Sequence, residues 1–310
     1  MSSSPPPTPP GMPQPRVWVD GHLVEDRPSF DALDHGITVG DGVFETAKVV
    51  DGQIFALTRH LDRMERSLAG LGLEPLDRGR VQLGLEAVLD VGPIAFGRIR
   101  WTVTAGPGPL GSDRAVGAAT YLVTAVEQDP PGHITTVAVV PWVRNERSAL
   151  AGLKTTSYAE NVVALAEAKR LGATEALLAN TQGRLCEGTG SNVFVVIDGV
   201  VHTPSLAEGP LAGVTRELTI EWLREEGVEV VEGEIPMTAL ATAEEIFVTS
   251  SIRDVAAVER VEVAQATRTL GGLELSAPLD APRDLGDAPG AVTAQAQEIF
   301  TRRAAETLDP

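Results

Sequence analysis

Cysteine is almost absent from this chain of 310 residues, where Cys186 is the only one. A single thiol excludes an intramolecular disulfide and any zinc site built from several cysteines. The five histidines show no metal-ligand spacing, so we expect no metal site. Lysine is also scarce, and Lys48, Lys154 and Lys169 are the only candidates for amine chemistry.

Basic charge and long apolar runs are in equally short supply. The 25 basic residues face 43 acidic ones, and the formal net charge is -18. This balance disfavours nucleic acid and anionic membrane surfaces as partners, because both require clustered Lys and Arg. No apolar run approaches ~18 residues, the length that a membrane-spanning helix needs. The first residues lack the basic head and apolar stretch of a secretory signal, so we expect a cytoplasmic protein.

Hydrophobic residues still make up 43% of the chain, which is enough for a sizeable core. Residues 1–15 are rich in Ser and Pro, so we expect them to be disordered. Residues 16–127 mix strands with two helices and predict a small α+β domain. The sequence Asp-Pro-Pro-Gly at 129–132 breaks the pattern, so we predict a linker at 128–133 and a larger domain at 134–310.

Local patterns place the individual elements, since alternating apolar residues and Asp-Gly turns predict strands and apolar spacings of three and four predict helices. The predicted strands cover residues 16–19, 22–25, 43–50, 53–57, 98–104, 119–126, 134–140, 175–180, 192–197, 200–202 and 245–249. The predicted helices begin near Thr58, Asp77, Ala159, Gly213 and Ala291 and end near Gly72, Leu89, Leu171, Gly227 and Leu308. Gly92 and Gly172 are expected to close the second and third of them. Thr58 is expected to be an N-cap.

Lys154 lies in an irregular stretch between a predicted strand and a predicted helix. In a recessed, partly dehydrated place a lysine can lose its proton and attack a carbonyl carbon. A lone lysine is usually a solvated surface residue, and Lys169, beside Arg170 near the end of a helix, fits that description.

Glu187 lies in a glycine-rich sequence, LCEGTGSN, at residues 185–192. Glycines leave room for a flat ligand to approach the backbone. A carboxylate there could keep a pyridinium nitrogen protonated, as a pyridoxal phosphate enzyme requires. The alternative is an ordinary carboxylate in a turn.

A phosphate seat is predicted where Gly213, Val214 and Thr215 open a helix. Free N–H groups at a helix start, the helix dipole and a hydroxyl all favour an anion. Arg59, near the start of an earlier helix, could add a forked phosphate contact. Taken singly, Thr215 could be an ordinary helix-start residue and Arg59 a surface arginine.

Five segments together resemble the class IV aminotransferase family, the fold-type IV pyridoxal phosphate enzymes. They are GDGVFETAKV (40–49), TRHLDRMERS (58–67), LAGLKTTSYAEN (150–161), EALLANTQGRLCEGTGSNVFVV (175–196) and LAGVTRE (211–217). The resemblance covers about residues 16–260 in the right order and spacing. It implies an α+β fold of two α/β domains with the pyridoxal 5'-phosphate site at their interface, and a homodimer that acts on a small amino substrate.

The resemblance also implies a role for individual residues. Lys154 would form a Schiff base with the cofactor and then transfer a proton, Glu187 would pair with the pyridinium nitrogen, and Tyr158 would lie near the phenolic oxygen. Leu211 would pack on the ring. The residues implied on the phosphate side are Arg59, Gly213, Val214, Thr215, Ser250 and Ser251.

Departures from the family's patterns bear on the substrate. D-Amino acid aminotransferases have a tyrosine where this chain has Ile37 and an arginine near Leu110, so their carboxylate trap is missing here. Branched-chain enzymes usually have a tyrosine at Val39 and an arginine at Lys48. We expect Val39, Lys48 and Arg100 to contact substrate, with Arg100, on the polar face of its strand, binding a carboxylate. The alternative for Arg100 is an exposed strand arginine.

Three functions stay open on this basis. The GDG-x-F-x-TA segment and the approach to Lys154 most resemble aminodeoxychorismate lyases, which release pyruvate and p-aminobenzoate for folate biosynthesis. The first alternative is an aminotransferase that uses a branched-chain amino acid, a D-amino acid or an (R)-amine with a 2-keto acid. The second is a catalytically silent pyridoxal-phosphate-binding protein, against which the intact set Lys154, Tyr158 and Glu187 argues.

Overall fold

The computed structural model describes residues 14–24, 29–115, 117, 119–268 and 272–310. Most of the segment expected to be disordered, residues 1–13, therefore lies outside the described residues. The chain divides into two compact units. Unit 1 comprises the chain up to Pro130 with Leu153–Ser157 and Asp309, and unit 2 comprises Pro131–Gly152, Tyr158–Leu308 and Pro310. Leu153–Ser157 thus belongs to unit 1, although the sequence placed it in the second domain.

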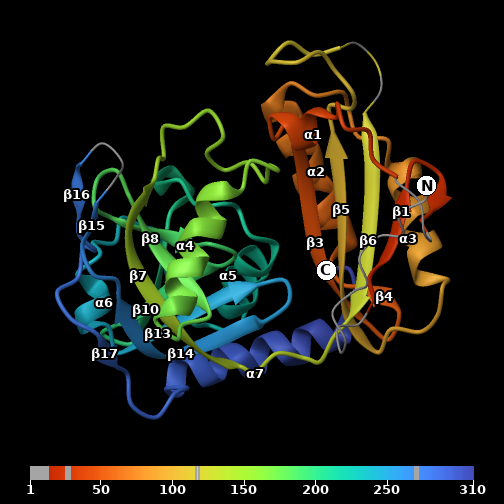
Figure 1. The fold of residues 1–310 in the computed structure, drawn as a ribbon. Helices are drawn as coiled ribbons and strands as arrows, with labels where there is room; N and C mark the ends of the chain where they lie inside the picture. The colour runs from red at the N-terminus through yellow and green to blue at the C-terminus, as the bar shows by residue number, and fades with distance from the viewer. Residues whose placement is uncertain (1–13, 25–28, 116, 118, 269–271) are drawn as a thin grey trace. The chain divides into compact units, whose positions relative to one another are not determined.

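Unit 1 is built on a six-stranded antiparallel sheet in the order β2-β1-β6-β5-β3-β4 (Figure 1). Its strands are β1 (Arg16–Val19), β2 (His22–Leu23), β3 (Gly42–Val50), β4 (Gln53–Ile54), β5 (Phe96–Thr104) and β6 (Thr120–Glu127). Its helices are α1 (His35–Thr38), α2 (Leu57–Leu71) and α3 (Arg78–Leu89).

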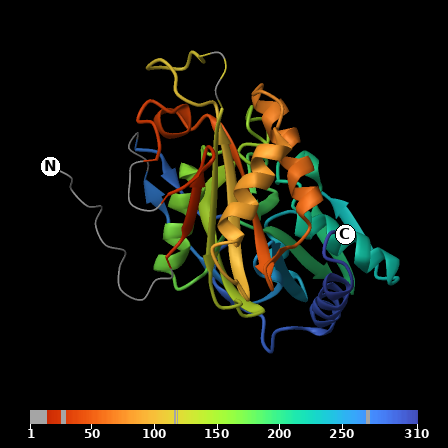
Figure 2. The ribbon, with the colours of Figure 1, turned by 90° about the vertical axis from the view of Figure 1, so that its right-hand side faces the viewer.

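One face of this sheet packs against α2 and α3, as Figure 2 shows. The predicted alternation in β5 places Ile99, Trp101 and Val103 in that core, where each is almost fully buried. Burial of apolar side chains at about 25 cal/mol per Å² is the main stabilising contribution to such a layer. The opposite face is not simply solvated, because Thr102 and Thr104 of the same strand are buried too.

Helix ends in unit 1 correct two predictions. Thr58 is not an N-cap, because α2 begins at Leu57 after Ala56 in a left-handed conformation, and the Thr58 hydroxyl donates instead to Asp309. Gly92 does not close α3, whose C-cap is Asp90. At the other end of α3 the Asp77 carboxylate caps the helix by accepting the N–H of Arg80 at 3.1 Å.

Unit 2 is built on a nine-stranded mixed sheet in the order β12-β11-β10-β13-β14-β7-β8-β9, with β17 paired to β14 (Figure 1). Its strands are β7 (Ile134–Arg144), β8 (Glu175–Asn180), β9 (Leu185–Gly188), β10 (Asn192–Ile197), β11 (Val200–Pro204), β12 (Val230–Gly233), β13 (Glu245–Ser250), β14 (Asp254–Val263) and β17 (Arg283–Asp284). A separate pair is formed by β15 (Thr267–Arg268) and β16 (Glu274–Leu275).

Helices pack on this sheet: α4 (Ala159–Arg170), α5 (Val214–Glu225), α6 (Ala239–Thr242) and α7 (Ala291–Glu306), with a 3-10 turn at Leu206–Glu208. Ala164 and Ala168 of α4 pack on Ala138 and Val140 of β7. The side chains between these in β7, such as Val139, face the opposite side and pack with α6. Trp222 of α5 contacts Phe300 of α7 with ring centroids 4.9 Å apart.

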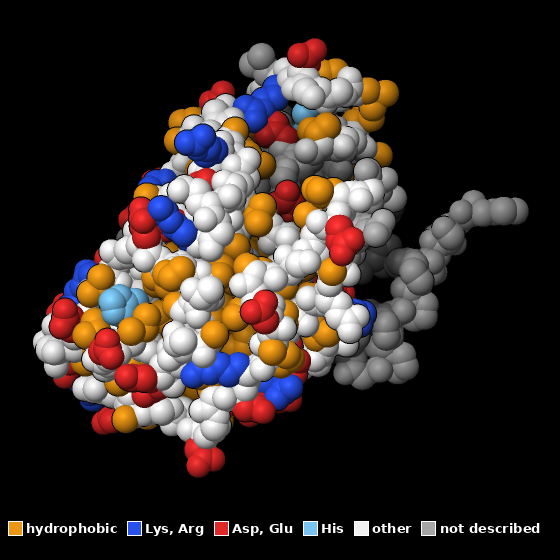
Figure 3. Space-filling view, turned by 90° about the vertical axis from the view of Figure 1, so that its left-hand side faces the viewer, with side chains coloured by type: hydrophobic (Ala, Val, Ile, Leu, Met, Phe, Trp, Pro, Cys, Tyr) orange, Lys and Arg blue, Asp and Glu red, His pale blue; other side chains and the backbone are white. Residues whose placement is uncertain are grey.

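The surface of the described residues carries charges of both signs. On the face in Figure 3, acidic and basic side chains are interspersed with hydrophobic ones. Within the described residues, no helix has both the length and the apolar composition needed to cross a membrane.

A buried ionic cluster fastens α2 to β3 in unit 1. The Glu45 carboxylate of β3 accepts hydrogen bonds from Nε and Nη2 of Arg63 at 2.8 and 2.6 Å, and His60 Nδ1 lies 2.7 Å from it. Burial alone would raise the pKa of Glu45, but the charge and hydrogen bonds of Arg63 outweigh it and lower the pKa to about 2. Burial also lowers the pKa of His60, which favours its neutral form.

Replacing Glu45 with Gln should destabilise the protein by ~3–5 kcal/mol, because it removes the carboxylate charge that the buried Arg63 guanidinium contacts. The lowered pKa of Glu45 means that its contribution is fully present above pH 4.5 and disappears as the pH falls toward 2. Denaturant unfolding of Glu45→Gln at several pH values should therefore show a weaker loss of stability in acid than the wild-type protein. An equal acid sensitivity of the two proteins would contradict this assignment.

Candidate active site

The backbone of Lys154 is hydrogen-bonded to β3 and α2 of its own unit, unit 1. The N–H of Phe44 donates to the Lys154 carbonyl at 3.0 Å, and the N–H of Thr156 donates to the Gly42 carbonyl at 2.8 Å. These bonds add a short antiparallel bridge to the start of β3. The Lys154 N–H also donates to Ser67 Oγ of α2 at 3.2 Å. The irregular stretch predicted from the sequence is therefore fixed at the lysine itself.

The Lys154 side chain meets an aromatic ring and a second cation. Its Nζ lies 4.5 Å from the centre of the Phe44 ring, and the guanidinium carbon of Arg100 lies 3.7 Å from the same centre. Each contact has cation–π geometry. Arg100 is half-buried and is not the exposed strand arginine that was the alternative. The Lys154 amine and the Arg100 guanidinium thus share one contact residue, Phe44.

The other expected substrate residues lie elsewhere in unit 1. Lys48 projects from β3 on the same side as Phe44, but it is buried and its Nζ lies 4.4 Å from the centre of the Phe55 ring. Val39 ends α1 and is 44% exposed. Arg59 lies in the first turn of α2 and is half-buried. The structure therefore groups Arg100 with Lys154 and gives Lys48 a different aromatic neighbour.

Glu187 lies in unit 2 within strand β9 and not in a turn. Both of its carboxylate oxygens accept hydrogen bonds. Oε1 accepts from Nε of Arg144 at 3.0 Å, and Oε2 accepts from the N–H of Leu211 at 2.9 Å. A carboxylate is an acceptor of the kind that a pyridinium N–H requires.

Tyr158 precedes α4 and uses its hydroxyl as a donor. The hydroxyl donates to the Thr189 carbonyl at 2.7 Å, and Asn161 Nδ2 donates to the same oxygen at 2.5 Å. Burial, followed by the negative charges of Glu187 and Glu175, raises the pKa of Tyr158 to about 12. The hydroxyl therefore keeps its proton at neutral pH.

The glycine-rich loop after β9 is wrapped around the buried carboxylate of Glu175. That carboxylate accepts the N–H of Thr189 at 2.9 Å, the N–H of Gly190 at 3.3 Å and the Ser191 hydroxyl at 3.0 Å. A side chain at Gly188 would collide with Ser191 Oγ. The glycine at 188 is thus explained by close packing within the loop.

Helix α5 begins at Val214 with Gly213 as its N-cap residue, and no side chain caps it within the described residues. Asn192 Nδ2 donates to the Leu211 carbonyl at 2.8 Å, and Asn192 pairs in register with Thr249 near the end of β13. Asn192 therefore links the start of α5 with the strand that ends at Ser250, while Ser251 follows in the turn.

The start of α5, next to the end of β13, has properties that favour an anion. The first N–H groups of a 12-residue helix are available there, and helix starts favour negative charge. Thr215 is buried, and the Thr249 hydroxyl is a buried polar group that makes no hydrogen bond to any described residue. A buried hydroxyl without a partner is costly, which suits a site that a ligand completes.

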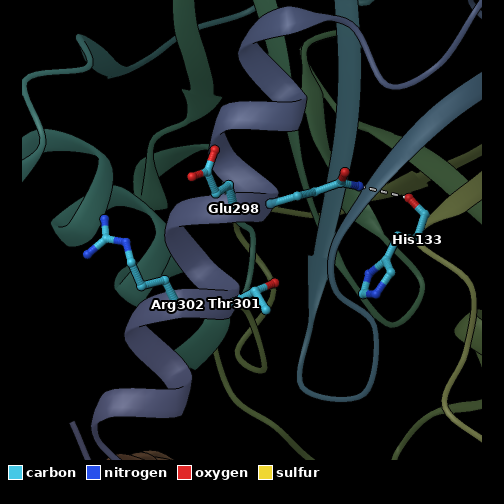
Figure 4. A pocket seen from close by; sticks show the side chains of 5 residues that line it. His133, Glu298, Thr301 and Arg302 are labelled. Carbon is cyan, nitrogen blue, oxygen red and sulfur yellow. Dashed lines mark hydrogen bonds between the residues drawn. The ribbon is translucent and has the colours of Figure 1, made fainter.

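A separate hollow in unit 2 contains none of the predicted site residues (Figure 4). It has a volume of about 360 Å³ and is lined by His133, Gln297, Glu298, Thr301 and Arg302. Gln297 Nε2 donates to the His133 carbonyl at 2.9 Å across its edge.

Sequence reasoning did not single out four residues that hydrogen-bond the candidate site residues or their partners: Ser67, Arg144, Asn161 and Thr189. Arg144 was hidden because β7 runs to residue 144, whereas the prediction ended the strand at 140 before Pro141. Asn161 and Ser67 are ordinary helix residues by pattern. Only their hydrogen bonds to distant segments connect them with the candidate site residues.

Comparisons with known proteins give one consistent result. Residues 42–261 match the family model described as amino-transferase class IV. The chain is 32% identical over 253 residues to a putative branched-chain-amino-acid aminotransferase of Methanocaldococcus jannaschii, covering 80% of this chain and 88% of that protein. It is 30% identical over 257 residues to the aminodeoxychorismate lyase of Bacillus subtilis, covering 79% and 86%. An aminotransferase from Brucella abortus bound to the cofactor PLP superposes with a TM-score of 0.78 at 25% identity, covering 94% and 99%.

Replacing Gly213 with Ala should reduce the free energy of unfolding by ~1–3 kcal/mol, because the new methyl group would collide with Asn192 Oδ1. Gly190→Ala is the matched control, since a Cβ at Gly190 would meet only Glu175 Oε2 at an ordinary 3.8 Å. Chemical denaturation measures both changes. Equal stabilities for the two variants would show that the start of α5 does not require a glycine.

Proposed function

This chain belongs to the class IV aminotransferase family, and we propose that it is a pyridoxal 5'-phosphate enzyme that acts on a substrate carrying both an amino group and a carboxylate. A family member of known structure binds this cofactor. The groups present here have the matching chemistry: one amine, one carboxylate, one neutral phenol and the N–H groups of a helix start.

Each proposed cofactor residue supplies one interaction. Lys154 Nζ is the covalent anchor and moves the proton at the substrate carbon that bears the amino group. Glu187 would accept the N–H of the ring, and Tyr158 would lie near the ring's oxygen. The residues proposed for the phosphate and the ring face are Arg59, Leu211, Gly213, Val214, Thr215, Ser250 and Ser251. When bound, the cofactor supplies an aldehyde for the amine and an electron-withdrawing ring.

The proposal depends mainly on one observation: Lys154 Nζ and the Arg100 guanidinium both lie against the ring of Phe44. A lysine that exchanges protons with an amino substrate needs the amine-bearing carbon beside it, and an adjacent guanidinium can position that carbon by binding a carboxylate of the substrate. Phe44 holds both cations at defined distances, so carboxylate binding and proton transfer would be aligned.

Within the family we propose that this protein is an aminodeoxychorismate lyase. The segments around Gly42 and Lys154 support it, and so does the 30% identity to the lyase of B. subtilis. The second candidate is an aminotransferase, which the 32% identity to the putative branched-chain enzyme of M. jannaschii favours. Val39 and Lys48 depart from the usual branched-chain residues, and we therefore place the aminotransferase second.

A substrate panel tests the choice. Purified protein loaded with pyridoxal phosphate is given aminodeoxychorismate alone, and in parallel L-leucine, D-alanine or an (R)-amine with 2-oxoglutarate. Formation of p-aminobenzoate and pyruvate supports the lyase. Amino transfer without p-aminobenzoate supports the aminotransferase, and cofactor binding without any turnover supports the silent binding protein.

Lys154→Ala should lower turnover by several orders of magnitude, because the amine that moves the proton is removed. Lys169→Ala is the control, since Lys169 is exposed near the end of α4. Single-turnover kinetics on the loaded proteins measure both. Turnover of Lys154→Ala within tenfold of wild type would contradict the assignment.

Arg100→Gln should raise KM for the carboxylate substrate ~10–100-fold, with a smaller change in kcat, because a charge-assisted hydrogen bond contributes ~1.5–3 kcal/mol. Arg98→Gln removes an exposed charge two residues away on the same strand face and should change KM little. Steady-state kinetics separate the two parameters. Similar KM values for both variants would remove Arg100 from substrate binding.

A further inference from the structure

A continuous chain of hydrogen bonds in unit 2 joins Glu187 to Tyr158. Arg144 occupies its centre. Its Nε donates to Glu187 Oε1 at 3.0 Å, and its Nη2 donates to Asn161 Oδ1 at 2.9 Å. Asn161 connects Arg144 with Tyr158, because its amide donates to the Thr189 carbonyl that also accepts the Tyr158 hydroxyl. Every link lies within one compact unit.

The backbone aims Arg144 into this position. The pairing of β7 with β8 shifts register between Val139 and Val143, next to Pro141, which cannot donate to the ladder. After the shift Arg144 pairs with Asn180, and its side chain is largely buried at 17% exposure. The register shift costs hydrogen bonds between β7 and β8, and it places the Arg144 side chain beside Glu187.

Only arginine has the shape for this task. Its planar fork donates in two directions at once, toward a carboxylate and toward an amide oxygen. Lysine would keep the positive charge beside Glu187, but a single ammonium on a flexible stem does not hold two acceptors in a fixed relation. A third contact, from Nη1 to Glu160 at 3.5 Å, is long, and the Glu160 side chain is 81% exposed.

We propose that Arg144 and Asn161 are positioning residues that hold Glu187 and Tyr158 in one fixed arrangement for the cofactor's ring. This inference rests on the proposed function, in which Glu187 and Tyr158 contact the ring nitrogen and the ring oxygen. Neither Arg144 nor Asn161 touches the reacting atoms in this account. Their effect is to orient both ends of the ring through one connected unit, so a disturbance at Arg144 reaches Tyr158.

The test uses Arg144→Lys, with Asn161→Ala as a second variant that leaves the Arg144–Glu187 contact in place. Glu160→Gln is the matched control, because it removes only the exposed contact of Arg144. Apoprotein is titrated with pyridoxal phosphate and followed by visible absorbance, and melting temperatures are recorded without cofactor. We expect Arg144→Lys and Asn161→Ala to bind the cofactor about tenfold or more weakly with near-wild-type melting, and Glu160→Gln to bind as wild type.

A double-mutant cycle separates positioning from simple support of the fold. Arg144→Lys is combined with Tyr158→Phe, which removes the hydroxyl at the far end of the chain. If the residues act as one unit, the loss of cofactor affinity from Arg144→Lys is at least threefold smaller in the Tyr158→Phe background. The inference is wrong if the two substitutions reduce cofactor affinity by independent factors. It is also wrong if the loss of affinity simply follows the loss of melting temperature.

The outcomes also distinguish this inference from the proposed function. If wild-type protein binds no pyridoxal phosphate, both are wrong. If wild type binds it and Arg144→Lys behaves like Glu160→Gln, the inference is wrong and the proposed function stands.

Discussion

The backbone pairing of residues 153–157 with the start of β3 is the constraint on which the chemistry depends. A lysine on a free loop would be a solvated cation, whereas here two strand-like hydrogen bonds and the Ser67 hydroxyl fix the Lys154 backbone. The fixed backbone limits where the Lys154 side chain can lie, and its Nζ contacts the ring of Phe44. The buried cluster around Glu45 fastens β3 to α2, so both elements that hold the lysine are themselves joined.

The second unit follows the same logic with side chains. Glu187 is fixed by Arg144 and by the Leu211 N–H, and Tyr158 is fixed through the Thr189 carbonyl. Glu175 in turn holds the loop that carries this carbonyl. A cofactor's ring can be oriented precisely only if the groups that contact it are held by others, and the burial of these partners strengthens their hydrogen bonds.

Much of this could be predicted from the sequence, for physical reasons that differ by element. Strands β8 and β10 were predicted at their observed bounds because each is a short apolar run followed by turn residues. Strand β9 was missed, since its four residues, LCEG, show no alternation, and Glu187 was therefore expected in a loop. Lys154 and Glu187 were singled out from motifs. Arg144 and Asn161 were not, because their hydrogen bonds join segments far apart in the chain, which no local pattern encodes.

The most direct test of the central claim is chemical trapping of the bond between cofactor and protein. The protein loaded with pyridoxal phosphate is reduced with borohydride, digested and mapped by mass spectrometry. The account predicts one phosphopyridoxyl label, on Lys154, with Lys48 and Lys169 unlabelled. A label on either of those lysines, or no label at all, would contradict it.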